Sequence, residues 1–354
     1  MFIINCDNFS ISVLRINLFT MIRYLLLVTL LILLPCVSRS QNRTRVQELS
    51  HLTLMAYNVE NLFDTIASNS YQDSDFTPTG AYTWTAKRYR SKLRKIAQVI
   101  LAVDTIHPAD IIALEEVESD TVLYDLLHNT PLRTIGYHYL ITKSLDSRGV
   151  NTALVYNPLQ FRLLKNNAIR IDNHKYRTRD VMHAIGVIPN GDTLHIFVVH
   201  LPSQLGGKKA LRMRKILLSK ISQTINTIFS SHLHPKVIVL GDFNASPHDS
   251  EIRKFVLSIP SFVNLSENRN GGSYKFRGRW EWIDQMIISS TLLSESASIF
   301  IPVPKLQVYS HSTMLESDFT YGQLKPRRTF LGNYYHGGFS DHLPIFIKML
   351  YRFK

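Results

Sequence analysis

Six short segments carry carboxylate, amide or imidazole side chains beside apolar runs of strand length; they are residues 57–61, 114–117, 199–203, 241–244, 282–285 and 340–344. Neighbouring strands can bring such residues into one cleft although they are far apart in the sequence. The side chains that could act together are Asn58, Glu60, Glu116, His200, Asp242, Asn244, Asp284, Asp341 and His342. Such a set could bind a divalent cation, position a water and stabilise charge on a phosphate, which is the chemistry of phosphoester hydrolysis.

Two of these segments place oxygen-bearing side chains two residues apart. Alternate side chains of an extended strand share a face, so Asn58 and Glu60 are expected on one face, as are Asp242 and Asn244. Paired oxygen donors suit a hard cation such as Mg²⁺, with Mn²⁺ as a substitute. Both cysteines of the chain lie within its first 40 residues, so the remainder offers neither a disulfide nor a thiolate zinc site.

Asp284 and His342 suggest a second chemical unit. A carboxylate beside an imidazole fixes its tautomer and favours its protonated form. Taken singly, the fragments have simpler explanations, such as a turn at Asp242 or a cap at Asp341. The recurrence of all six beside apolar strands favours a common site.

The scaffold is predicted from eight strand-length apolar runs, at residues 52–57, 111–114, 139–142, 152–156, 194–200, 237–240, 283–288 and 343–349. Residues 86–102 and 208–229 have helical spacing, with apolar residues on one face and Lys and Arg on the other. Mixed strands and helices without a flexible linker predict a single α/β domain over residues 41–354. The loops at 61–84 and 303–333 are long, which is typical of functional rims.

The first forty residues have the pattern of a signal peptide. Arg23 precedes the apolar run 24–34, and small residues follow it. This predicts export to the periplasm or the medium, with cleavage before Gln41. Residues 1–20 are expected to be an over-long start, with Met21 as the working initiator.

Membrane attachment is the disfavoured alternative for this leader. The run 24–34 is shorter than the roughly 20 apolar residues that a membrane span needs. A lipid anchor at Cys36 would require cleavage directly before the cysteine, and Pro35 at that position fits poorly.

The chain is strongly basic. It has 40 Lys and Arg against 27 Asp and Glu, a formal charge of +13. Without the three arginines and one aspartate of residues 1–40, 37 basic and 26 acidic residues remain, or +11. Such a surface attracts polyanions, including nucleic acid, anionic headgroups and phosphate esters.

The order of the six segments resembles the endonuclease/exonuclease/phosphatase superfamily, which has the DNase I-like fold. The resemblance runs from about residue 52 to residue 347, and its most specific motifs are Gly241-Asp242-Phe243-Asn244 and Ser340-Asp341-His342-x-Pro344. It implies a four-layer α/β/β/α sandwich of two mixed sheets flanked by helices, with the site at one rim. It also implies a metal-dependent phosphoric ester hydrolase of the secreted bacterial type.

The resemblance assigns the metal side of the site to four residues. Glu116 looks like the principal Mg²⁺ ligand, with Asn58 and Glu60 completing or supporting it. Asp341 is implied as a second metal contact.

The resemblance assigns catalysis to five residues. Asp242 would orient or deprotonate the attacking water, and Asn244 resembles the amide that orients the phosphate. His342, held by Asp284, would contact the scissile phosphate. His200 matches the position that touches a phosphate oxygen on the leaving-group side.

Three positions depart from the pattern of the superfamily. Glu115 stands where many members carry Gln, Gln285 where many carry His, and Val198 where many carry Asn. These changes affect phosphate contacts and leave the metal and water positions intact.

The candidate substrate contacts outside these motifs are Arg148, Ser203, Lys275 and Arg277. The basic and aromatic stretch 274–280 could stack bases or simply pack under a loop. In the segment 201–207, which resembles a variant of secreted bacterial members, glycines could let backbone N–H groups approach an anion or could form a plain loop.

Three functions remain open from the sequence. The positive charge favours a nuclease acting on DNA or RNA. The alternative is a phosphatase or phosphodiesterase acting on phospholipid headgroups or inositol phosphates, and a non-catalytic binding protein is disfavoured by the complete set of polar residues. No protein partner is implied, so we expect a monomer.

Overall fold

The computed structural model describes residues 49–171 and 177–353, which belong to one compact unit. The expected leader, with Met21 and Cys36, lies outside the described residues. Within the described ranges, no helix is both long enough and apolar enough to span a bilayer.

The first mixed sheet is built around β1 (Leu49–Leu62), which pairs in parallel with β2 (Ile111–Val117) and antiparallel with β19 (Ile345–Arg352). The strand order is β13-β19-β1-β2-β4-β3, and β14 also pairs with β19. The remaining strands are β3 (His138–Ile141), β4 (Asn151–Tyr156), β13 (Ile299–Phe300) and β14 (Gln307–Val308). The register pairs Asn58 with Glu115, so two polar segments meet at one edge of this sheet.

The second sheet has the order β5-β6-β7-β8-β12-β9. Its strands are β5 (Arg162–Ile169), β6 (Val181–Val187), β7 (Thr193–His200), β8 (Lys236–Asp242), β9 (Phe262–Asn264) and β12 (Asp284–Ser289). The parallel pair β7 and β8 sets His200 opposite Asp242, and the antiparallel pair β8 and β12 sets Asp242 opposite Asp284. Three of the predicted site residues therefore lie side by side at one sheet edge.

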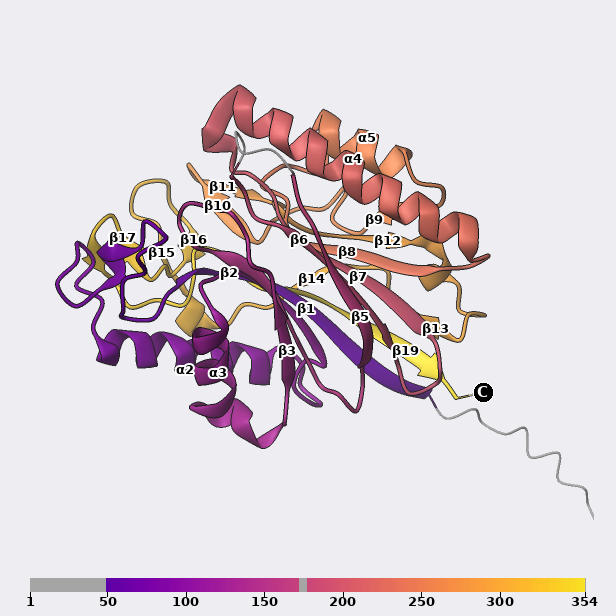
Figure 1. Cartoon of the computed structure of the whole chain (residues 1–354), viewed down its shortest axis with the longest axis horizontal. Coiled ribbons are helices and arrows are strands. Elements are labelled where there is room, and N and C mark those ends of the chain that lie inside the picture. Colours follow the sequence, from indigo (N-terminus) through magenta and orange to yellow (C-terminus); the bar gives the residue numbers. More distant parts are fainter. Residues whose placement is uncertain (1–48, 172–176, 354) are drawn as a thin grey trace, which may run out of the picture. The chain divides into compact units, whose positions relative to one another are not determined.

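Helices cover the outer face of each sheet (Figure 1). α2 (Ala86–Ala102) and α3 (Asp120–His128) pack on the first sheet, and α4 (Gly207–Ser231) and α5 (Ser250–Leu257) pack on the second. Alternating residues of β1 divide between two cores: Leu54 lies between the sheets, whereas Met55 packs in the core that contains α2. The predicted α/β/β/α sandwich is confirmed.

Both predicted helices are present, and the structure adds elements that the sequence patterns did not reveal. α2 has the predicted bounds, and α4 extends the predicted stretch by one residue at its start and two at its end. α3 and α5 have only nine and eight residues, too few for a clear helical period. β5 is an edge strand with mostly exposed residues, so it lacks the apolar signal of a buried strand.

The two long loops are packed parts of the structure. Phe76, in the first loop, stacks on Phe63 with ring centroids 4.3 Å apart and meets Phe330 of the second loop edge-on at 6.1 Å. The second loop contains one short hairpin, β15 (Leu315–Ser317) with β16 (Leu324–Pro326), and ends in another, β17 (Phe330–Leu331) with β18 (Tyr334–Tyr335). Aromatic packing between the loops gives the rim a defined shape.

Candidate active site

Several residues of the site have left-handed backbone conformations. The φ angles of Glu60, Glu116 and Asn244 are +52°, +64° and +49°. L-residues other than glycine adopt this region at a cost of roughly 1 kcal/mol or more, and such residues cluster at functional sites. Gly241 has a φ of +126°, and a Cβ there would lie 2.2 Å from the carbonyl oxygen of Val199. The backbone turns sharply where these side chains are presented.

Asp242 lies at the centre of a fixed hydrogen-bond network. Asn58 Nδ2 donates to its Oδ2 at 3.1 Å, and the backbone N–H of Asn244 donates to its Oδ1 at 2.8 Å. The pKa of Asp242 is raised to about 7, mainly by burial; His342 opposes the rise and the nearby Asp284 adds to it. The carboxylate is thus held in place with a basicity suited to accepting a proton near neutral pH.

Asn244 supports Asp242 more directly than the sequence predicted. Its Nδ2 donates to Asp242 Oδ2 at 3.1 Å and to the carbonyl oxygen of Leu201 at 2.9 Å. Both amide N–H groups are therefore engaged with the protein, in place of the phosphate that the resemblance implied.

Asp284 and His342 form a buried pair. His342 Nδ1 lies 2.7 Å from Asp284 Oδ2, which also accepts a hydrogen bond from Ser273 Oγ. Burial alone would lower the pKa of His342, but Asp284, Asp341 and Asp242 outweigh it and raise that pKa well above its ordinary value. His342 is consequently a protonated donor whose Nε2 is directed away from Asp284.

Glu116, His200 and Arg148 lie beside Asp242. His200 Nε2 is 3.7 Å from Glu116 Oε1 and 3.6 Å from Asp242 Oδ2. Arg148 Nη1 lies 3.5 Å from Glu116 Oε1. Burial, together with Arg179 and Arg148, lowers the pKa of His200 well below its ordinary value, so this imidazole is neutral. The structure thus brings Glu116 next to the Asp242 cluster.

Glu60 and Asp341 both contact Arg328, and Asp341 Oδ1 also lies 3.9 Å from His342 Nε2. Glu60 Oε2 accepts the backbone N–H of Thr329 at 2.6 Å, and Arg328 lies 3.4 Å from Glu60 Oε1 and 2.7 Å from Asp341 Oδ2. The register between β1 and β2 shifts after Asn58, and the left-handed Glu60 turns its side chain away from the direction of Asn58. The predicted pairing of Asn58 and Glu60 on one face is therefore wrong.

The site holds more acidic than basic groups, which fits a divalent cation. Its acidic side chains are Glu60, Glu115, Glu116, Asp242, Asp284 and Asp341, and the cations near them are Lys92, Arg148, Arg179, Arg328 and His342. Ligand atoms of Asp242, Asp284 and His342 lie within 4.8 Å of one another. Oxygen donors of this kind suit Mg²⁺ or Mn²⁺, and a bound cation would relieve the repulsion that contributes to the raised carboxyl pKa values.

Glu115 is the least compensated acid of the site. It is 0% exposed, and neither carboxylate oxygen has a hydrogen-bond partner. Burial, followed by repulsion from Asp284 and Asp242, raises its pKa well above the ordinary value. This departure from the Gln of many superfamily members places a neutral carboxylic acid where an amide is usual.

We expect Glu115→Gln to stabilise the metal-free protein by about 1–3 kcal/mol at pH 8, because it removes a buried group that ionises on unfolding. The carboxyl pKa is higher in the folded state, so the wild type loses stability as the pH rises above about 4.5, where the unfolded chain ionises. The gain should shrink towards pH 4.5. Urea denaturation at several pH values measures this gain in the free energy of unfolding, and Glu267→Gln on the surface is the control. A Glu115→Gln variant that is less stable than the wild type at pH 8 would contradict the prediction.

The other two departures have structural roles. Gln285 Nε2 donates to the carbonyl oxygen of Ala245 at 2.6 Å, and its Oε1 accepts from Asn264 Nδ2 at 2.7 Å. Val198 is buried in the core between the sheets. Neither side chain faces the cluster around Asp242.

Of the four candidate substrate contacts, Lys275 and Arg148 are paired with acidic side chains, whereas Arg277 and Ser203 are exposed. Lys275 Nζ donates to the carbonyl oxygen of Gly322 at 2.7 Å and pairs with Asp318 at 3.2 Å. It therefore links two loops of the protein, whereas the sequence predicted a substrate contact. The Arg277 guanidinium lies 5.1 Å from the centre of the Phe276 ring. Arg148 lies at Glu116, and Ser203 lines a separate cavity behind Leu201.

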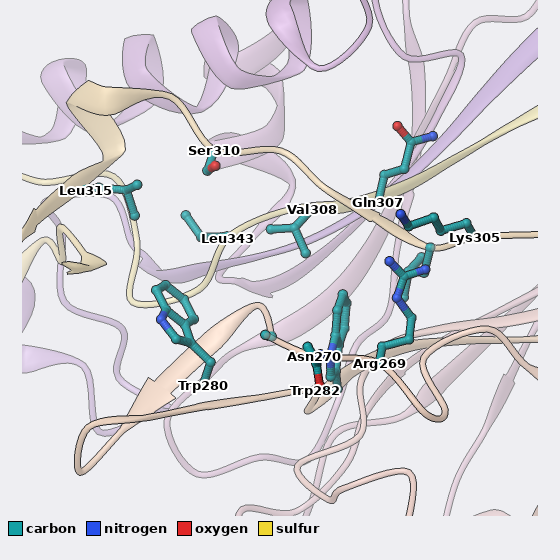
Figure 2. A pocket seen from close by; sticks show the side chains of 13 residues that line it. Arg269, Asn270, Trp280, Trp282, Lys305, Gln307, Val308, Ser310, Leu315 and Leu343 are labelled. Carbon is teal, nitrogen blue, oxygen red and sulfur yellow. The ribbon is translucent and has the colours of Figure 1, made fainter. Parts of the chain in front are cut away.

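A cavity of about 450 Å³ lies between the segment that carries the two tryptophans and residues 305–315 (Figure 2). Trp280 and Trp282 line one side of it, with Val308 and Leu343 opposite. The Arg269 guanidinium lies 5.5 Å from the centre of the Trp282 ring. Leu343, one of its lining residues, directly follows His342 in the chain.

Sequence reasoning missed four residues that support the site, namely Lys92, Arg179, Ser273 and Arg328. Lys92 is buried and donates to the carbonyl oxygen of Phe339 at 2.6 Å, and burial lowers its pKa to about 8 although Glu60 opposes the shift. The sequence pattern of α2 places Lys92 on the charged face, which is expected to be exposed to solvent. The length of the loop that carries Arg328 was the one signal available for that residue.

The facing sheets, the buried acids and the two histidines at one rim define a phosphoester hydrolase of the DNase I-like class. The chain belongs to the Endonuclease/Exonuclease/phosphatase family, and the match spans residues 53–351. Comparison with curated proteins gave no significant match. Family membership thus supports phosphoester hydrolysis as the type of activity.

Solved structures support the same fold. An endonuclease/exonuclease/phosphatase family protein from Bacteroides thetaiotaomicron is 16% identical, with a TM-score of 0.54, and the match covers 87% of this chain and 100% of that one. Truncated TDP2 from Caenorhabditis elegans is 17% identical, with a TM-score of 0.52 and coverage of 85% and 97%. The catalytic domain of human Nocturnin is 17% identical, with a TM-score of 0.53 and coverage of 85% and 96%.

Proposed function

We propose that the chain is an exported, Mg²⁺-dependent phosphodiesterase that cleaves nucleic acid. The observation that carries this proposal is the convergence of an immobilised base, Asp242, a protonated donor, His342, and the acid Glu116 around the neutral His200. In-line attack of water on a phosphodiester needs these groups close together. We also propose that the protein acts as a monomer.

Each residue has a distinct part in the proposed reaction. Asp242, oriented by Asn58 and Asn244, takes a proton from the attacking water as the water oxygen bonds to phosphorus. The P–O bond to the leaving group breaks, and the leaving oxygen takes a proton from solvent. His342, held by Asp284, donates to a phosphate oxygen as negative charge develops there.

The metal side of the site is proposed to rest on Glu116. A bound Mg²⁺ would supply positive charge to the phosphate oxygens, with Asn58, Glu60 and Asp341 supporting its electrostatic surroundings. Arg148, 3.5 Å from Glu116, can bind a phosphate oxygen, and neutral His200 lies against both acids. Asn58 donates a hydrogen bond to Asp242, and Glu60 and Asp341 contact Arg328. The three residues would therefore influence the cation through these neighbours.

Charge and cavity lining support nucleic acid as the substrate. Residues 41–354 carry a net charge of +11. The cavity that Leu343 lines has the half-buried Trp280 in its wall, with Arg269 and Lys305, and an aromatic ring near cations suits a base followed by a phosphate. The Nocturnin structure contains a bound sulfate anion, an analogue of phosphate. Phospholipid headgroups and inositol phosphates share the phosphate chemistry and are the second candidate class.

An activity panel tests this proposal. The protein from Gln41 onward is incubated with DNA, RNA, phospholipids and inositol phosphates, with EDTA or with added Mg²⁺ or Mn²⁺. We expect cleavage of DNA or RNA that falls at least tenfold in EDTA, returns with Mg²⁺ and weakens steeply with salt. Turnover of lipids alone would move the assignment to the second class, and no turnover of any ester with either metal would overturn the proposal.

A further inference from the structure

We propose that the Arg328 guanidinium is a built-in cation of the active site. It occupies the place between Glu60 and Asp341 that would otherwise bind a second divalent ion, and it donates to a phosphate oxygen of the substrate. Arg328 lies in the loop between β16 and β17. This inference deepens the proposed function and rests on it for the phosphate substrate. The proposed reaction then needs only the divalent ion at Glu116.

Two carboxylates converge on this guanidinium. Arg328 Nε lies 3.4 Å from Glu60 Oε1, and Arg328 Nη2 lies 2.7 Å from Asp341 Oδ2. The side chains of Glu60 and Asp341 are only 6% and 17% exposed. Burial raises the pKa of Glu60, and repulsion from Asp341 adds to the rise. The two acids therefore form a cation-binding place, and Arg328 fills it.

The charge balance at this place disfavours a divalent ion while Arg328 is present. The buried Lys92 is attracted by both acids, and it donates hydrogen bonds to Thr329 Oγ1 and to the carbonyl oxygen of Phe339. Two carboxylates thus face two cationic side chains, Lys92 and Arg328. A divalent ion added to this set would meet an excess of positive charge. Removal of Arg328 would instead leave one negative charge uncompensated and a place for an ion.

The backbone on both sides of the guanidinium is held in place. The carbonyl oxygen of Arg328 accepts the backbone N–H of Gly338 at 2.9 Å. Glu60 Oε2 accepts the backbone N–H of Thr329 at 2.6 Å, so Glu60 holds both the side chain of Arg328 and the peptide that follows it. A cation that is oriented before the substrate binds stabilises developing charge without the cost of reorganisation.

The exposed part of Arg328 is available to the substrate on the side of His342. The Arg328 side chain is 41% exposed, although both of its acidic partners are largely buried. Asp341 Oδ2 contacts Arg328 and Asp341 Oδ1 lies 3.9 Å from His342 Nε2, so two cationic donors flank one carboxylate. Arg328 Nη1 contacts no acceptor among the described residues. Guanidinium N–H groups bind phosphate oxygens well, and the proposed contact runs from Nη1 to the phosphate that accepts from His342.

The direct test counts bound Mn²⁺ at pH 7 from the electron paramagnetic resonance signal of the free ion. We expect Arg328→Ala to bind one Mn²⁺ more than the wild type, because two acids then face a place without its cation. Arg327→Ala removes the same charge from the adjacent exposed position and should leave the number of bound ions unchanged. Combining Arg328→Ala with Asp341→Asn should abolish the additional ion. No additional ion in Arg328→Ala, or an additional ion that persists in the double variant, would overturn the proposal.

A kinetic test addresses the contact with phosphate. At low Mn²⁺, Arg328→Ala should lower kcat/KM for an oligonucleotide by about tenfold relative to the wild type, the typical loss of one hydrogen bond to a charged group. The loss should shrink as Mn²⁺ fills the additional place, whereas Arg328→Lys, which keeps the charge, should show no such recovery. An unchanged kcat/KM, or a loss that Mn²⁺ does not relieve, would overturn the role of Arg328. Ion counting needs no turnover, so a protein that gains the additional ion but cleaves no ester would contradict the nuclease proposal alone.

Discussion

Replacing Asp242 with Asn is expected to lower kcat for phosphodiester cleavage by about 10²–10⁴-fold, the range that a general base contributes. The amide keeps the size of the side chain but cannot accept the proton of the attacking water. Asp242 is fixed by Asn58 and by Asn244, so no other described carboxylate can take its place without moving. Steady-state kinetics on a short oligonucleotide measures the loss, and Asp120→Asn on the exposed start of α3 is the matched control.

The pH profile gives a second test of this residue. Burial raises the pKa of Asp242 to about 7, so the fraction of active, deprotonated base increases as the pH rises through that value. A bound cation favours the carboxylate, and higher Mg²⁺ should therefore move the acid limb of the profile to lower pH. The Asn variant should lack this limb. A variant that keeps both the limb and wild-type kcat would exclude Asp242 as the base.

The layers of the fold could be predicted because the apolar runs of the central strands are long and continuous. β7 and β8 are buried on both faces, and each ends in a site residue, His200 or Asp242. The family motifs lie at such strand ends, which explains why most of the central cluster was named from the sequence. Short elements such as α3 and polar edge strands such as β5 lack these signals.

The surroundings of the site could not be predicted in the same way. Arg328 reaches Glu60 from 268 positions along the chain, and no sequence pattern encodes that contact. The left-handed Glu60 breaks the strand alternation on which its pairing with Asn58 was predicted. Lys275 was predicted as a substrate contact, but its ion pair with Asp318 depends on how two loops pack. Side-chain direction at bulges and loops is decided by tertiary contacts.

Replacing His342 with Gln is expected to lower kcat by about 10²–10³-fold, the typical loss for one donor to a developing oxyanion. The protonated imidazole provides both a hydrogen bond and a positive charge, and Gln retains at most the hydrogen bond. His234→Gln, at an exposed position, is the control. Wild-type kcat in His342→Gln would remove His342 from the proposed mechanism.

Variants of Asp284 separate the contribution that the positive charge of His342 makes to kcat from the contribution of its position. Asp284 is the largest influence that raises the pKa of His342 against burial, so Asp284→Asn should make the imidazole neutral at lower pH and cause activity to fall as the pH rises. Because the two residues act as one unit, the double variant Asp284→Asn with His342→Gln should be about as slow as the slower single variant. Losses that multiply would show that they act independently. The cycle also controls for folding, since a merely structural pair would change the unfolding midpoint without shifting the alkaline limb of the rate profile.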